Sequence, residues 1–241
     1  MIKFFRKIRQ RLLTENKFSK YLIYAIGEIV LVVIGILIAL QINTWNEERK
    51  ANEHETKLLK DLLSEIKFSI EEVDTVAFYN QDSYRYLELI ENHITDDLPY
   101  SKVLDTAFGR LDTWYMPYLP FSAYESLKES GIESISNDSI KQKITHLYEF
   151  GMKFLLEDNG NWEWSFNQNT TQRFMTKHIR RLRENRDLAR PVNYEVLKQD
   201  EEFKNFISVL IAVRRSHVGA LKDISLYMNK LSPSIEEEIK K

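Results

Sequence analysis

The sequence of 241 residues predicts an all-α protein, with one N-terminal transmembrane helix followed by an extracytoplasmic up-and-down helical bundle. Three observations lead to this prediction. A long apolar run lies near the N-terminus, apolar residues recur at helical spacing in the later segments, and strand-type alternation of useful length is missing. We therefore expect one membrane span and one helical domain.

The apolar run Tyr21–Ile42 reads YLIYAIGEIVLVVIGILIALQI. As a helix it would extend about 33 Å, enough to cross a hydrocarbon core of about 30 Å. A cleaved signal peptide is the main alternative, but the flank QINTWNEERK offers no small-x-small cleavage site. We therefore expect an uncleaved span over residues 21–45.

The distribution of charge predicts the orientation of this span. Residues 1–20 contain seven Lys and Arg against one Glu, whereas the whole chain has a net charge of −2. By the positive-inside rule, the N-terminus is expected in the cytoplasm and residues 46–241 in the periplasm, as a single-pass protein of the inner membrane. Residues 1–20 are either a basic amphipathic segment lying on the inner leaflet or a loose basic segment that only sets the topology.

Composition and motifs exclude several classes of function. The chain has no cysteine, so it has no disulfide framework and no thiol chemistry. It lacks a phosphate-binding glycine loop, a G-x-S-x-G elbow and H-E-x-x-H, and its five histidines do not have metal-ligand spacing. We therefore expect no catalytic residue, no cofactor and no metal site. Nucleic acid is not expected as a partner of a negatively charged domain outside the cytoplasm.

The first helix is expected to be very long. No Gly or Pro occurs between Ile36 and Leu98, so the span can continue into the outer domain and end before Pro99. Alternating steps of four and three residues are typical of a bundle or coiled-coil helix. The series comprises Leu59, Leu63, Ile66, Ile70, Val73, Ala77, Asn80, Tyr84, Leu87, Glu91 and Ile94.

Four more helices complete the expected bundle. The first covers Phe121–Ser130, and the second begins after an N-cap at Asn137. The third runs from Trp162 to about Asn185, and the last from Asp200 to Leu231, ending at Pro233. Such a set of helices is typical of an up-and-down bundle.

The last of these helices has one polar residue in its apolar stripe. His217 lies among Phe206, Leu210, Val213 and Ile224 at helical spacing. It is either a buried, hydrogen-bonded core histidine or a pH sensor.

Two segments carry a resemblance to a known family. FFRKIRQRLLTENKFSKYLIYAIGEIVLVVIGILIALQINTWNE, at about residues 4–47, resembles the N-terminal signature of an uncharacterised family of small single-pass membrane proteins from Bacteroidota. YESLKESGIESISNDSIKQKITHLYEF is similar to the midsection of that family. The resemblance implies inner-membrane placement and a helical outer domain, and it implies no catalytic residue.

An aromatic loop is the first candidate binding surface. The segment WYMPYLPF contains Trp114, Tyr115, Tyr118 and Phe121, and its two prolines prevent a regular helix. These aromatic side chains either form a partner-binding surface or fold over the core of the bundle.

A basic cluster is the second candidate. Arg180, Arg181, Arg183 and Arg186 lie close together after the third outer helix begins. They are candidates for binding an anionic group, and the alternative is a solvated helix face paired with local acids.

The span itself carries the third set of candidates. Glu28 is an acid within the apolar run, where a charge is costly and therefore a functional candidate. Gly35 and Ala39 form a small-x-x-x-small pair that favours helix packing. The leading hypothesis is a non-enzymatic membrane protein that binds a partner or ligand and uses its span as anchor and oligomerisation helix. Its partners would be the bilayer and either a second copy or another membrane protein.

Two other classes of function stay open. An accessory subunit of an ion-coupled membrane complex would use Glu28, by a weak analogy of layout with single-span partners of proton-driven stators. A sensor would pass the state of its outer domain along the continuous helix to a separate output protein.

Overall fold

The computed structural model describes residues 18–241, so the predicted basic segment 1–20 lies almost wholly outside the described residues. Contacts divide the chain into two units, Met1–His54 and Glu55–Lys241. Helix α2 (Phe18–Thr95) contributes to both units without a break. The prediction of one long helix that ends before Pro99 is therefore confirmed for the described residues.

The described part of the first unit is the N-terminal portion of α2. Its apolar side chains are exposed; Ile23, for example, is 68% exposed and Leu31 is 66% exposed. Among the described residues, α2 alone is long and apolar enough to cross a membrane, with a mean hydropathy of 2.6 in its most apolar window. The crossing itself stays a prediction.

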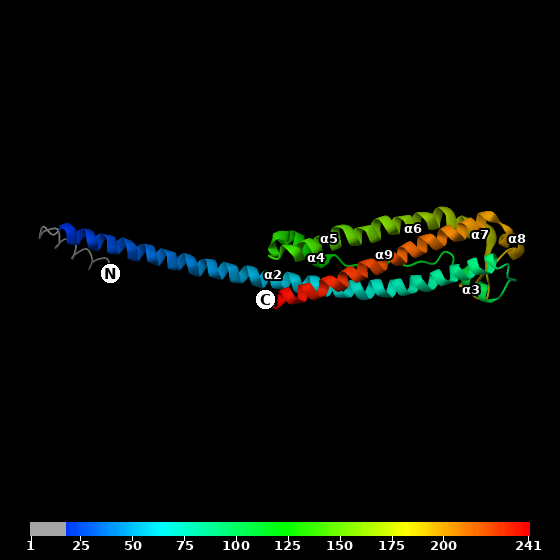
Figure 1. Cartoon of the computed structure of the whole chain (residues 1–241), viewed down its shortest axis with the longest axis horizontal. Coiled ribbons are helices and arrows are strands. Elements are labelled where there is room, and N and C mark those ends of the chain that lie inside the picture. Colours follow the sequence, from blue (N-terminus) through cyan, green and yellow to red (C-terminus); the bar gives the residue numbers. More distant parts are fainter. Residues whose placement is uncertain (1–17) are drawn as a thin grey trace. The chain divides into compact units, whose positions relative to one another are not determined.

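Three long helical segments form the second unit (Figure 1). They are the part of α2 after His54, a segment over residues 138–178, and α9 (Glu201–Ile239). Between the first two, the chain forms α3 (Val103–Gly109), returns along the bundle as an extended segment over 113–121, and enters α4 (Ser122–Ser130). The all-α prediction is confirmed, with the extended segment where a regular bundle would have a fourth long helix.

The segment over residues 138–178 is helical throughout but changes its winding. Asn137 caps its start, since the side-chain oxygen accepts hydrogen bonds from the backbone N–H groups of Ser139 and Ile140 at 3.1 and 3.3 Å, as predicted. The segment comprises α5 (Asp138–His146), the π-helices η2 (Leu147–Met152) and η3 (Phe154–Asn159), α6 (Gly160–Phe166), the π-helix η4 (Asn167–Thr171) and α7 (Gln172–His178).

The predicted helix from Trp162 to about Asn185 ends earlier than expected, and this prediction is wrong for its last turns. The chain becomes extended at Ile179, and β1 (Ile179–Arg181) pairs antiparallel with β2 (Ala189–Pro191). The hairpin docks on α3 because Arg190 makes a two-pronged ion pair with Asp105, with distances of 2.8 and 2.6 Å. Tertiary ion pairs therefore outweigh the local helical preference.

The predicted end of the last helix at Pro233 is also wrong. Helix α9 contains Pro233 and continues to Ile239. Proline removes one backbone hydrogen bond, but Leu231 and Ile235 on either side are buried against the rest of the bundle, at 2% and 0% exposure. Burial of the flanking side chains offsets the loss. Two short helices, α3 and α8 (Tyr194–Gln199), were not predicted.

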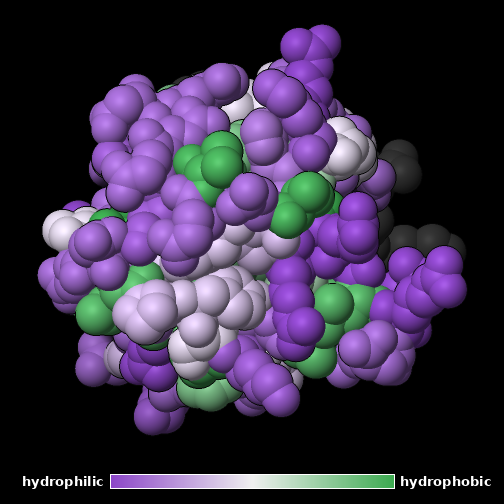
Figure 2. Space-filling view, turned by 90° about the vertical axis from the view of Figure 1, so that its right-hand side faces the viewer, coloured by the Kyte–Doolittle hydropathy of each residue, from purple (hydrophilic) through white to green (hydrophobic). Residues whose placement is uncertain are grey.

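The end of the bundle formed by α3, α8 and the hairpin presents a mostly hydrophilic surface with isolated hydrophobic residues (Figure 2). Val192 and Val196 are exposed there, at 61% and 64%. Scattered apolar residues of this kind are normal on a protein surface.

Candidate functional site

A layer of polar side chains divides the hydrophobic core of the bundle into two clusters. On α2, the first cluster includes Leu58 to Ala77 and the second Leu87 and Ile90, with Asn80 and Ser83 buried between them. The other two long segments are divided in the same way, with polar residues between the parts that belong to the two clusters. There the intervening residues include Asn159 and Glu163 before α7, and Arg214 and His217 on α9. We call Asn80, Asn159, Glu163, Arg214 and His217 the polar layer.

An incompletely paired ion pair lies in this layer. Glu163 on α6 and Arg214 on α9 are each 1% exposed, and Nη1 of Arg214 donates to Oε2 of Glu163. Among the described residues, Oε1 of Glu163 and both Nε and Nη2 of Arg214 have no hydrogen-bond partner. Burial raises the pKa of Glu163 and lowers that of Arg214, and the ion pair opposes both shifts. Buried polar atoms without partners are costly, so this ion pair is an unusual feature of the core.

The other half of the layer holds the extended segment in place. Nδ2 of Asn80 donates to the carbonyl of Tyr115 at 2.8 Å, and the N–H of Tyr115 donates to Oδ1 of Asn80 at 3.0 Å. Nε2 of His217 lies 3.0 Å from the same carbonyl, and its Nδ1 contacts the side-chain amide of Asn159. Burial lowers the pKa of His217, which favours the neutral imidazole. The interpretation of His217 as a buried, hydrogen-bonded histidine is confirmed.

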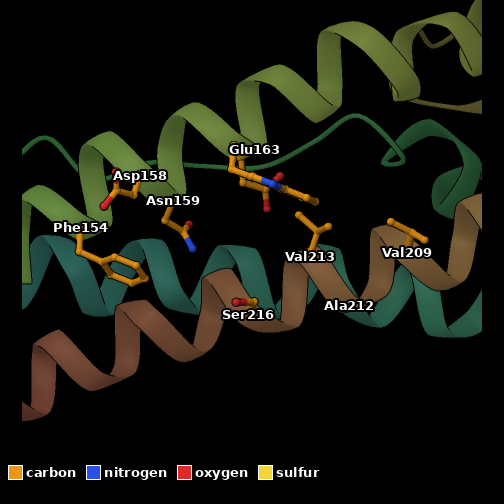
Figure 3. Close-up of a pocket in the computed structure, with 9 residues that line it drawn as sticks. Phe154, Asp158, Asn159, Glu163, Val209, Ala212, Val213 and Ser216 are labelled. Atoms are coloured by element: carbon orange, nitrogen blue, oxygen red, sulfur yellow. The ribbon is translucent and has the colours of Figure 1, made fainter.

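A groove of about 520 Å³ opens beside the ion pair (Figure 3). It runs between η3 and α6 on one side and α9 on the other. Glu163 forms part of its lining, and Phe154 and Trp162 are large apolar side chains that stay more than half exposed in it. The full lining comprises Phe154, Asp158, Asn159, Trp162, Glu163, Val209, Ala212, Val213 and Ser216.

The winding of the helix positions this lining. The π-helices η3 and η4 lie directly before and after α6, which carries Glu163. Insertions of π-helix are rare and often occur at functional sites. The extended segment also approaches α6 closely, since a Cβ on Gly160 would lie 2.9 Å from the terminal methyl group of Met116. Because that group is the end of a flexible side chain, it could shift to admit a larger residue.

The structure distributes the predicted aromatic residues between two environments. Trp114 is partly buried, with its ring centroid 5.8 Å from the guanidinium of Arg214, and Phe121 packs edge-on against Tyr148. Tyr115 is 36% exposed and Tyr118 is 87% exposed. The first two side chains face the core of the bundle, and the two tyrosines remain accessible.

The predicted basic cluster lies on the hairpin and not on a helix. Arg181 makes a two-pronged ion pair with Asp112, at 2.8 and 2.9 Å, and also donates to the carbonyls of Gly109 and Arg186. This contact is tight, because a Cβ on Gly109 would lie 1.9 Å from the carbonyl oxygen of Asp187. Arg181 is therefore occupied in holding the hairpin, whereas Arg180, Arg183 and Arg186 are exposed.

The candidates in the apolar segment lie on α2. Glu28 is partly exposed, and Gly35 has open space around it within the described chain. Ala39 follows one turn later and is exposed. The roles assigned to these three residues stay predictions.

Sequence reasoning missed Glu163 and Arg214. Arg214 lies in the charge-rich helix α9 and Glu163 is the one charged residue of α6, and charged residues are usually exposed. The only available signal was position, since Arg214 lies four residues after Leu210 and three before His217, on the buried face of α9. Within residues 18–241, no group of acidic, His or Cys residues could hold a metal ion.

Comparison with known proteins assigns the family. Residues 28–212, more than half of the chain, match the family of unknown function DUF6090. The protein is a member of this family. The match begins in the apolar part of α2 and ends within α9, so it covers Glu163 and most of the groove lining. A search of curated proteins found no match, and neither did a search of solved structures.

Proposed function

We propose that this member of DUF6090 is a non-enzymatic binding protein of the inner membrane. The apolar part of α2 is its anchor, and the helical domain binds a partner protein on the periplasmic side. An apolar helix with exposed side chains favours the anchor. The basic residues before this helix favour a cytoplasmic N-terminus.

The observation that carries the proposal is an exposed aromatic surface on a fixed backbone. We call Phe78, Tyr79, Tyr115 and Tyr118 the tyrosine face. Phe78 and Tyr79 are 70% and 51% exposed, and the rings of Tyr79 and Tyr115 lie 5.6 Å apart. Tyrosine is enriched among the residues that contribute most to binding at protein interfaces.

The backbone under this surface is held at two points. The side chain of Asn80 forms hydrogen bonds with the backbone C=O and N–H of Tyr115, and the backbone N–H of Tyr118 donates to Oε1 of Glu72 at 3.1 Å. Because the segment is already ordered, a partner would not bear the entropic cost of ordering it. A second copy of the chain is one such partner, since Gly35 and Ala39 would let two apolar helices approach closely.

Site-specific photo-crosslinking in cells would test this function. A crosslinker at Tyr118 should capture a discrete protein partner, whereas one at Val196, which is also exposed, should not. The captured species also identifies the partner, because a second copy gives a product of twice the mass of the chain. No product at Tyr118, or identical products at both positions, would contradict the proposal.

A reporter at the C-terminus would test the topology. A reporter enzyme that works only in the periplasm should be active when it is fused to Lys241. A reporter that works only in the cytoplasm should be inactive at the same position. The reverse result would place the helical domain in the cytoplasm.

A further inference from the structure

The groove beside Glu163 has the features of a small-molecule site. Its volume of about 520 Å³ lies within the usual range of roughly 300–1,000 Å³ for such sites. Five of its nine lining residues are apolar, and the polar ones are Asp158, Asn159, Glu163 and Ser216. This site is separate from the tyrosine face, so the inference goes beyond the proposed function.

The decisive feature is the unused oxygen of Glu163. Glu163 lines the groove with a side chain that is 2% exposed and an Oε1 that is itself buried, and Arg214 contacts only its Oε2. Oε1 has no partner among the described residues. A carboxylate oxygen only accepts hydrogen bonds, so a ligand that satisfies Oε1 must bring a donor.

The charges around the groove select a cationic donor. Asp158 at the exposed edge is a second acid, and the lining contains no Lys or Arg, while Arg214, which is not part of the lining, compensates the charge of Glu163. A carboxylate or phosphate ligand would therefore meet the negative charge of Asp158, with no cation in the lining to offset it. An ammonium group would instead make a charge-assisted hydrogen bond to Oε1, which is stronger than a neutral one.

The aromatic lining of the groove favours a ligand whose cationic group is attached to an apolar group. Phe154 and Trp162 are 55% and 54% exposed and line the groove. Aromatic faces attract cations and bury apolar groups. We propose that the groove beside Glu163 binds a small primary amine carried on an apolar or aromatic body.

A neighbouring hollow provides an internal contrast. It lies along α7 and α9, shares Val209 with the groove, and has a volume of about 420 Å³. Its lining includes Arg173 and Lys177 against one acid, Glu202, so its net positive charge disfavours a cation. The two hollows have similar size and apolar character, and they differ in the sign of their charge.

Fluorine NMR on the full chain in lipid nanodiscs would test the proposal. The probes are para-fluorophenethylamine, the matched alcohol and the matched carboxylate para-fluorophenylpropionate, with empty nanodiscs as the background for lipid partition. The amine should bind, and the alcohol and carboxylate should bind at least about tenfold more weakly, because a charged hydrogen bond is lost. Equal binding of amine and alcohol, or no binding of the amine, would overturn the proposal.

Two matched variants locate the binding. Ala212 lines the groove and is exposed, so Ala212→Phe should fill the groove and abolish amine binding without disturbing the core. Ser208→Phe adds the same side chain to an exposed position of α9 that lines neither hollow, and it should bind like the wild type. Amine binding that survives Ala212→Phe would show that the amine binds elsewhere.

Two charge variants identify the groups that recognise the amine. Glu163→Gln should weaken amine binding about tenfold and leave the binding of the alcohol unchanged. Should this variant fail to fold, as judged by circular dichroism, Asp158→Asn at the exposed edge should still weaken amine binding by about threefold. Amine affinity that is unchanged in both variants would refute the role of the acids. Crosslinking at Tyr118 is independent of every outcome here.

Discussion

Glu65 and Glu163 are both buried on long helical segments, at 7% and 1% exposure, but their surroundings differ. Oε2 of Glu65 accepts hydrogen bonds from the hydroxyl of Ser122 and the N–H of Ala123 at 3.0 and 2.8 Å. Its Oε1 accepts from the hydroxyl of Tyr148 at 2.8 Å. Glu163 has one partner, Arg214, and one oxygen without any among the described residues.

The difference separates a structural carboxylate from one available to a ligand. Glu65 caps the first turn of α4 from the neighbouring helix, because the residue at the N-cap position, Phe121, has no side-chain acceptor. Its partners come from α4 and η2, so it joins three elements. Glu163 also joins two helices, but its Oε1 has no hydrogen-bond partner among the described residues, and the residue lines a groove.

Breaking the ion pair in the polar layer should have the largest effect on stability. Arg214→Ala leaves Glu163 buried without its counter-charge, so the free energy of unfolding should fall by about 3–5 kcal/mol. Denaturant unfolding of the full chain, followed by circular dichroism, measures this. The neighbouring Arg215, whose side chain is 69% exposed, is the matched control, and Arg215→Ala should unfold like the wild type. Equal losses in the two variants would mean that the buried pair has no special role.

Replacing both charged residues of the buried ion pair by apolar residues should change stability in the opposite direction. In Glu163→Leu combined with Arg214→Met, the cost of burying two incompletely paired charges disappears, so stability should be unchanged or rise by about 1–4 kcal/mol. The same unfolding experiment applies. A large loss of stability would show that the ion pair stabilises the fold, as Glu65 does, and would contradict the distinction between the two carboxylates.

Removing the charge of Glu65 should weaken the bundle. Glu65→Gln turns one acceptor into a donor that faces existing donors, so stability should fall by about 1–3 kcal/mol. The loss should appear in the melting temperature of the full chain. A neutral effect would contradict the structural role assigned to Glu65.

Stability should also depend on pH through His217. Burial lowers its pKa in the folded protein below the ordinary 6.5. Below about pH 6.5 the unfolded chain therefore binds more protons than the folded one, and stability falls as pH falls, by at most ~1.4 kcal/mol per pH unit. His217→Gln should reduce this slope in melting curves recorded across the range. A slope that is unchanged in the variant would assign the effect to other groups.

The smallest change in stability is expected at the tyrosine face. Tyr118 is 87% exposed, so Tyr118→Ser should alter stability by no more than about 0.5 kcal/mol. The same change should reduce partner capture if the surface binds a partner. A large drop in melting temperature would instead mean that Tyr118 belongs to the core.

The sequence by itself determined the features that depend on neighbouring residues. The apolar, exposed start of α2 is visible in an unbroken run of side chains. The N-cap at Asn137 and the stop of α4 at Gly131, with φ of 87°, follow from the local chemistry of those two residues. Helical periodicity also predicted six of the buried residues of α2, which are Leu59, Ile66, Val73, Ala77, Asn80 and Leu87.

Only the tertiary structure decided the features that depend on distant residues. The hairpin after His178 exists because Arg181 and Arg190 form ion pairs with Asp112 and Asp105, which lie 69 and 85 residues earlier in the chain. Helix α9 continues through Pro233 because its flanking side chains are buried. Glu163 and Arg214 are 51 residues apart, and nothing local marks either one as buried. Their pairing, and the groove beside it, arise when α6 and α9 pack together, because burial and charge compensation are properties of the contact between helices and not of either helix alone.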